Sequence, residues 1–125
     1  MQISLKGTNI KILESTTEYV DSKLVRTVEK FLLARQSLGE GGVKNGEPVS
    51  LSIEVELTTK HHRKGKIFRA EAKLAMGKKV LYAEAFGETL NEAIDLLEEE
   101  LEQAIKHFKG KARALMLKGA RKSIF

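Results

Sequence analysis

The alternation of apolar and polar residues predicts four strands. The clearest case is residues 49–57, where every second residue is apolar and the intervening residues are Ser or Glu. The same period of two recurs at residues 2–6, 68–74 and 80–86, and a tight turn at 76–79 separates the last two segments. This period places alternate side chains on opposite faces of a sheet. Each strand therefore has one face towards a core, although Tyr82 and Phe86 make the other face of the last strand unusually aromatic.

Two helices are predicted by a helical spacing of apolar residues behind a capping signal. Ser15-Thr16-Thr17-Glu18 and Thr89-Leu90-Asn91-Glu92 both have the spacing of a capping box. The first helix carries Val20, Leu24, Val28 and Phe31 on one stripe and is expected to end before the glycine-rich segment 39–46. The second helix continues to about residue 109, and Gly110 is its expected stop.

The order of these elements predicts the fold class. Strand, helix, three antiparallel strands and helix make a β-α-β-β-β-α protein of the α+β class, with two helices packed on one face of a four-stranded sheet. The pattern leaves open how the first strand pairs with the others. We expect one domain at residues 1–109 and a basic C-terminal tail at residues 110–125.

Composition narrows the class of protein. The chain has 125 residues, of which 42% are hydrophobic and 31% charged, as in a soluble globular protein. It has no cysteine, which excludes disulfides and thiolate chemistry and fits a reducing compartment. No signal peptide or membrane span is visible, so we expect a cytoplasmic protein without a membrane partner.

Charge is segregated along the chain. Residues 60–79 hold eight bases and one acid, residues 84–102 hold eight acids and no base, and residues 106–125 hold seven bases and no acid. The net charge is +5. Part of this segregation suits the dipole of the second helix, which favours acids at its start and bases at its end. The remainder predicts a surface that binds a polyanion.

Catalytic and metal-binding patterns were not found. His61 and His62 are adjacent, so on a strand they would point to opposite faces and could not share a metal. Glu98, Glu99 and Glu100 are consecutive on a helix and sweep around its axis. The glycines at 39–46 match no phosphate-binding loop. We therefore expect no enzyme, cofactor, metal site or small-molecule substrate.

Basic residues are the candidate functional residues. Lys23, Arg26 and Lys30 have helical spacing, and their stripe differs from the apolar one. This stripe is either an ordinary solvated face or part of a phosphate-binding surface, which Lys106 and Lys109 would extend. Tyr82 and Phe86 are candidates for base stacking or for contact with a partner protein.

Several short motifs, in order, resemble one known family. Met1-Gln2-Ile3, Gly7-Thr8-Asn9-Ile10, Tyr19-Val20, Lys23-Leu24 and Glu29-Lys30-Phe31 are similar to the ribosome hibernation promoting factors, also called ribosome-associated inhibitors or ribosomal subunit interface proteins. Residues 80–85 and then Leu90, Ala93-Ile94-Asp95 and Leu101-Glu102 resemble the last strand and second helix of the family. The resemblance covers residues 1 to about 111.

The resemblance implies a fold similar to double-stranded RNA-binding domains and a role in ribosome hibernation. Relatives bind the small ribosomal subunit where messenger and transfer RNA would sit, and so inhibit translation under stress. Long relatives pair ribosomes through an extra C-terminal domain, so we do not expect these 125 residues to pair ribosomes by themselves. The alternatives are a general double-stranded RNA-binding module and a protein-interaction module.

The resemblance also implies that bases on both helices contact ribosomal RNA. Glu100 and Gln103 depart from the family because relatives often have bases there, and the basic hairpin at 60–66 is expected to compensate. The candidate RNA-binding residues are Lys23, Arg26, Lys30, Lys60, His61, Arg63, Lys64, Lys66, Lys106, Lys109, Lys111 and Arg113.

Overall fold

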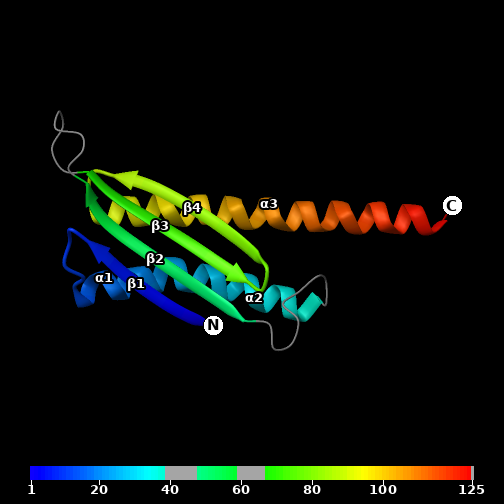
Figure 1. The fold of residues 1–125 in the computed structure, drawn as a ribbon, viewed down its shortest axis with the longest axis horizontal. Helices are drawn as coiled ribbons and strands as arrows, with labels where there is room; N and C mark the ends of the chain where they lie inside the picture. Colours follow the sequence, from blue (N-terminus) through cyan, green and yellow to red (C-terminus); the bar gives the residue numbers. More distant parts are fainter. Residues whose placement is uncertain (39–47, 59–66, 125) are drawn as a thin grey trace.

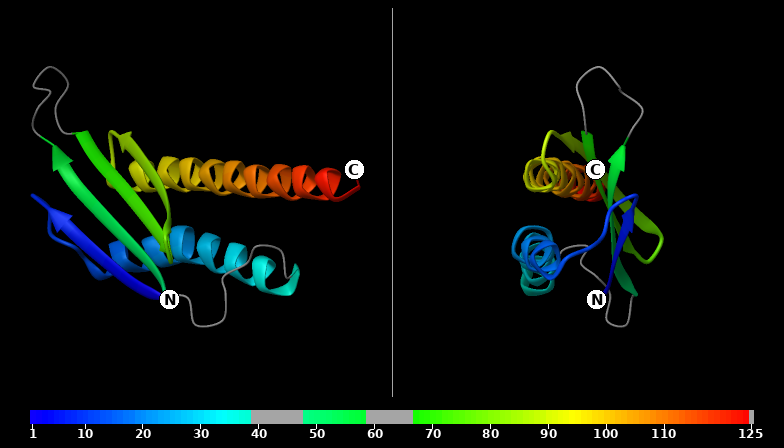
Figure 2. Two further views of the ribbon diagram at one scale, coloured as in Figure 1. Left: turned by 45° about the vertical axis from the view of Figure 1, so that its right-hand side comes forward. Right: turned by 90° about the vertical axis from the view of Figure 1, so that its left-hand side faces the viewer.

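The protein has two layers, a four-stranded sheet and a pair of long helices on one face of it (Figures 1 and 2). The structure, a computed structural model, describes residues 1–38, 48–58 and 67–124. At 34–38 and 111–124 it describes the backbone alone. The predicted α+β class and element order are confirmed. The elements are β1 (Gln2–Thr8), α1 (Glu14–Val20), the π-helical segment η1 (Asp21–Val25), α2 (Arg26–Leu38), β2 (Val49–Thr58), β3 (Ile67–Met76), β4 (Lys79–Gly87) and α3 (Leu90–Ile124).

The sheet has the order β1-β2-β3-β4, and β1 pairs with β2 in parallel. Because β1 stands at the end of this order, it is an edge strand. Its Ile3 lies opposite Leu51 and its Leu5 lies opposite Ile53. This pairing supplies the orientation that the sequence left open. The other two pairs are antiparallel, as predicted. The turn between β3 and β4 contains Gly77, whose positive φ of 60° favours glycine.

The first helix is continuous through α1, η1 and α2, and it begins earlier than predicted. Leu13 is the N-cap without a side-chain hydrogen bond, so the expected capping box at Ser15 is wrong. Thr16 and Val20 are both buried, and this i, i+4 pair can face the core only if Thr16 is already helical. The wider π turn of η1 allows both Leu24 and Val25 to be buried.

The second helix, α3, begins as predicted and ends later. The Thr89 hydroxyl accepts a hydrogen bond from the Glu92 backbone N–H at 3.0 Å, which confirms its capping role. The expected stop at Gly110 is wrong, because α3 continues to Ile124 and extends past the sheet (Figure 1). Among the described glycines only Gly77 has a positive φ, so Gly110 lacks the left-handed conformation of a glycine stop.

The core lies between the sheet and the helices. Each of the residues on the predicted first-helix stripe is at most 3% exposed, as are Leu51, Ile53 and Val55 on β2. Alanines line the inner face of β3 and β4, and this small surface lets α3 approach closely. The backbones come close at Gly87, where a Cβ atom would lie 2.6 Å from the Ala93 nitrogen. Gly87 therefore sets the distance between β4 and the start of α3.

Candidate nucleic-acid interface

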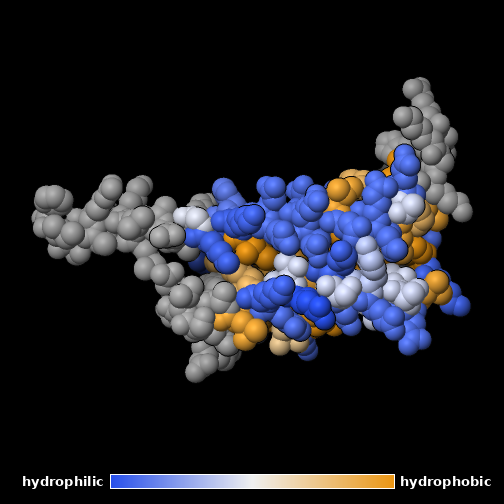
Figure 3. Space-filling view, turned by 180° about the vertical axis from the view of Figure 1, so that it is seen from behind, coloured by the Kyte–Doolittle hydropathy of each residue, from blue (hydrophilic) through white to orange (hydrophobic). Residues whose placement is uncertain are grey.

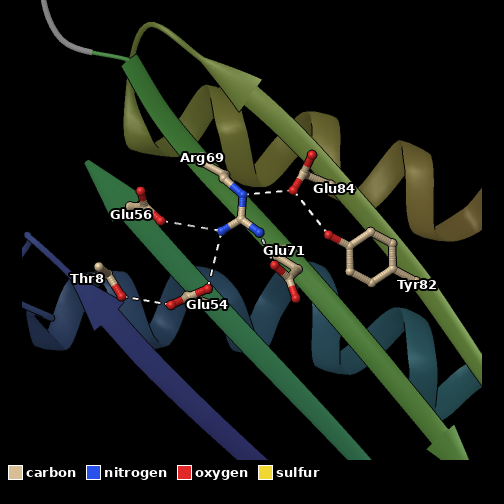
Figure 4. A network of polar contacts seen from close by, with 7 residues as sticks. All are labelled: Thr8, Glu54, Glu56, Arg69, Glu71, Tyr82 and Glu84. Atoms are coloured by element: carbon tan, nitrogen blue, oxygen red, sulfur yellow. Dashed lines mark hydrogen bonds and ion pairs between the residues drawn. The ribbon is translucent and has the colours of Figure 1, made fainter. Parts of the chain in front are cut away.

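The outer face of the sheet holds a network of carboxylates around one guanidinium group (Figure 4). Arg69 donates hydrogen bonds to Glu84 at 2.8 Å, to Glu54 at 3.2 Å and to Glu71, and it lies 3.5 Å from Glu56. These residues come from β2, β3 and β4, because the register places positions 54, 71 and 84 in one row and 56 and 69 in the next. Arg69 is thus fully occupied with protein carboxylates.

The same network sets the ionisation of its members. The hydroxyl of Thr8 on β1 donates to Glu54 at 2.7 Å, and this bond and that from Arg69 lower the pKa of Glu54 despite its partial burial. Burial alone would lower the pKa of Arg69, but its hydrogen bonds to Glu84, Glu54 and Glu71 raise it instead. The lowered pKa favours the charged form of Glu54, and the carboxylates gathered on this face make it unsuited to bind a polyanion.

The helix layer has a different distribution of charge. Figures 1 and 2 show the first helix (α1, η1 and α2) and α3 running in the same direction, so the acids of α1 and η1 and those at the start of α3 lie at the same end of the layer. Figure 3 shows this layer from outside, with hydrophilic side chains over both helices and apolar patches between them. We call the opposite end of the layer the basic half; its described bases are Lys30, Lys106 and Lys109, all exposed.

At the acidic end, the helices are joined by contacts among three side chains. The Tyr19 hydroxyl donates a hydrogen bond to Asp95, and the Lys23 ammonium lies 3.7 Å from the same carboxylate. The bond to Asp95 raises the pKa of Tyr19. Nearby, partial burial raises the pKa of Glu98; Lys23 opposes this rise, whereas Glu102 and Asp95 add to it. Lys23 is therefore placed among acids, where it serves the helix contact.

Arg26 is also placed among acids. It lines an open groove of about 510 Å³ between β1 and the first helix, together with Ile3, Val25, Ser22 and the carboxylates of Glu18, Asp21 and Glu29. No ion pair joins Arg26 to another described residue. The predicted stripe thus has three different environments: Lys23 is paired with Asp95, Arg26 lines an acidic groove, and Lys30 is exposed on the basic half.

Two aromatic rings and two lysines meet at the basic half. The rings of Phe31 on α2 and Phe108 on α3 are edge to face, with centroids 6.1 Å apart. The ammonium of Lys109 lies 5.5 Å from the Phe31 centroid, and that of Lys79 lies 5.0 Å from the Phe108 centroid. Both distances are within the range of cation–π attraction. We call Phe31, Lys79, Phe108 and Lys109 the aromatic–lysine cluster.

The comparisons with known proteins identify the family. The profile of the sigma 54 modulation protein / S30EA ribosomal protein family matches residues 3–113. The chain belongs to this family. No curated protein sequence matches it. The predicted resemblance is therefore confirmed at the level of the family.

Two solved structures share the fold. The N-terminal domain of Protein Y from Thermus thermophilus is 25% identical, with a TM-score of 0.60 over 86% of this chain and 99% of that domain. A ribosomal subunit interface protein from Coxiella burnetii is 17% identical, with a TM-score of 0.58 over 88% of this chain and 99% of its own. The second likeness supports the fold alone.

The structure describes only part of the predicted RNA-binding set. Lys60, His61, Arg63, Lys64 and Lys66 lie outside the described residues. Lys111 and Arg113 belong to α3, which continues the basic half, and their side chains are not described. The role of all these residues stays a prediction. β2 ends at Thr58 and β3 begins at Ile67. These two residues pair at the opposite end of the β2–β3 ladder from Met76.

The sequence pattern did not place Lys79 beside either helix. It was counted among the bases of residues 60–79, but no periodicity connected it with either helix. The sequence pattern placed Lys79 within a turn at 76–79, whereas it is the first residue of β4, and only the packing of β4 beside α3 brings it to Phe108.

Other chemistry is not supported by the described residues. Across 1–38, 48–58 and 67–124, no three His, Asp, Glu or Cys side chains are arranged to hold a metal ion. His107 is exposed on α3. No helix in this described part is long and apolar enough to cross a membrane.

Proposed function

We propose that the protein binds the small ribosomal subunit through ribosomal RNA, in the channel used by messenger and transfer RNA, and thereby inhibits translation during ribosome hibernation. Membership of the S30EA ribosomal protein family is the observation that carries this proposal. The description of this family as a ribosomal protein supports a ribosomal partner. The protein would act in the cytoplasm without catalysis.

The distribution of charge supports RNA as the contacted component. Phosphates attract lysine and arginine regardless of base sequence, and each neutralised phosphate releases counterions. The exposed bases of the basic half meet this requirement, whereas the outer face has Glu54, Glu56, Glu71 and Glu84 against Arg69, Lys6 and Lys73. RNA would therefore contact the helix layer at its basic half.

Sedimentation with small ribosomal subunits over a series of salt concentrations tests this surface. The double variant Lys30→Glu/Lys106→Glu reverses two exposed charges on the basic half and should abolish most co-sedimentation. Lys6→Glu/Lys73→Glu makes the same charge change on the outer face and is the matched control. Thermal unfolding confirms that both variants are folded. Equal loss of binding by the two variants would contradict the proposed surface.

Two further arms separate the proposed function from the alternatives. Comparable affinity for a plain RNA duplex and for the small subunit would favour a general double-stranded RNA-binding module. Binding to ribosomes without displacement of messenger RNA or inhibition of cell-free translation would contradict occupation of the channel. Binding that resists both high salt and nuclease would favour a protein partner.

A further inference from the structure

The aromatic–lysine cluster combines residues from three elements that are distant in the sequence. Phe31 comes from α2, Lys79 begins β4, and Phe108 and Lys109 lie on α3. Lys79 is 48 residues from Phe31 and 29 residues from Phe108, as their numbers show. The edge-to-face ring pair bridges the two helices, and a lysine lies over each ring. The fold thus gathers two positive charges on one apolar support.

The position of Lys79 is well defined by its surroundings. It directly follows the tight turn of Gly77 and Lys78, and the Gly77 N–H donates to the Pro48 carbonyl at 3.0 Å. Met76, just before the turn, is only 2% exposed, and its backbone pairs with Lys79 across the hairpin. These contacts fix the backbone of Lys79, while the contact with the Phe108 ring restricts its side chain and so reduces the side-chain entropy lost on binding.

The charges of Lys79 and Lys109 are available to an anion. Neither lysine forms an ion pair with any residue in the described part of the chain, in contrast to Lys23 with its partner Asp95. A cation–π contact orients an ammonium group, and the face of the group turned away from the ring keeps its hydrogens for other acceptors. The cluster therefore presents two oriented donors with their charges uncompensated by carboxylates.

We propose that Lys79 and Lys109 bind phosphates of the RNA backbone, and that Lys79 extends the RNA-binding surface from the helices to the β3–β4 turn. This inference rests on the proposed function for the identity of the RNA. The phosphate chemistry itself rests on the cluster alone. The two lysines would contact the charged phosphates and not the bases, so the contact does not depend on the base sequence.

Single variants at the turn test the inference. Lys79→Met keeps the apolar stem over Phe108 and removes the charge, whereas Lys79→Arg keeps the charge. Lys73→Met is the control, because Lys73 is exposed on the outer face and forms no ion pair with a described residue. Binding to the small subunit and to a naked RNA duplex is measured over a salt series, and thermal unfolding monitors stability.

We expect Lys79→Met to lower the affinity several-fold and to reduce the slope of log K against log salt by about one. Lys79→Arg should keep the affinity and the salt slope of the wild type, and so should Lys73→Met. An unchanged affinity and slope for Lys79→Met on RNA that the wild type binds would overturn the inference. If the wild type binds the duplex but not the ribosome, the proposed function fails, and the effect of Lys79→Met on the duplex still decides the inference.

Discussion

Replacing Arg69 by glutamine would leave four glutamates on the outer face without their common counter-ion. Arg69 is 17% exposed in its side chain, and its partners range from 24% to 33%. Glutamine is too short to replace three hydrogen bonds that spread from β3 to the strands on both sides. The variant therefore tests how much the network stabilises the sheet.

The expected loss lies between that of a surface ion pair and that of a buried one. Exposed pairs contribute about 0–1 kcal/mol, and breaking a fully buried pair costs about 3–5 kcal/mol. We take about 0.5–1 kcal/mol for each of the three hydrogen bonds because the partners are a quarter to a third exposed. Repulsion among the remaining carboxylates adds about 1 kcal/mol. The free energy of unfolding should fall by about 2.5–4 kcal/mol.

Urea unfolding at pH 7 and low salt measures this loss. With a denaturant slope of about 2 kcal/mol per molar, in the middle of the usual range, the midpoint should decrease by about 1–2 M. Lys73→Gln, which removes a charge from the same strand and face, should shift it far less. RNA binding by the folded Arg69→Gln protein should be unchanged. A midpoint equal to that of the wild type would refute the idea that Arg69 stabilises the sheet, and lost RNA binding would refute its exclusion from the interface.

Two further predictions concern close packing and pH. Gly87→Ala should destabilise the protein by about 1–3 kcal/mol in thermal unfolding, because its Cβ would lie 2.6 Å from the Ala93 nitrogen. Gly110→Ala is the control, because a Cβ at Gly110 would have no atom within 4 Å. Equal effects of the two substitutions would contradict the packing argument. In the folded protein the pKa of Glu54 lies below its usual value of 4.5. The charged Glu54 therefore stabilises the fold above pH 4.5, and this stabilisation is lost as the pH falls through the lower folded pKa. Glu54→Gln should therefore be less stable than the wild type at pH 7, and the difference should shrink under acid conditions; a constant difference would contradict this linkage.

Much of the fold could be predicted from local patterns. The alternation at 49–57 identified the core face of β2, and the spacing of Val20, Leu24, Val28 and Phe31 identified the buried stripe of the first helix. These patterns are informative because each face of an element must be consistently apolar to be buried. The ends of the helices were less predictable, since capping signals at Ser15 and Gly110 compete with burial of Thr16 and with the strong helix formers after residue 110.

The candidate site was less accessible from sequence. Lys23, Arg26 and Lys30 were grouped because they follow helical spacing, but their environments depend on Asp95 and on the groove beside β1. Arg69 belonged to a basic stretch of the sequence, yet the strand register surrounds it with glutamates from three strands. Counting charges along a chain cannot reveal which of them neutralise one another across a sheet.

The sequence by itself determined the order of strands and helices, which of their faces are buried and to which family the chain belongs. The tertiary structure alone decided that β1 is parallel to β2, that the basic ends of the two helices lie together, and that Lys79 joins Lys109 beside two phenylalanines. The physical reason is that local periodicity reports the environment of each side chain, whereas its neighbours depend on strand register and helix packing between distant segments.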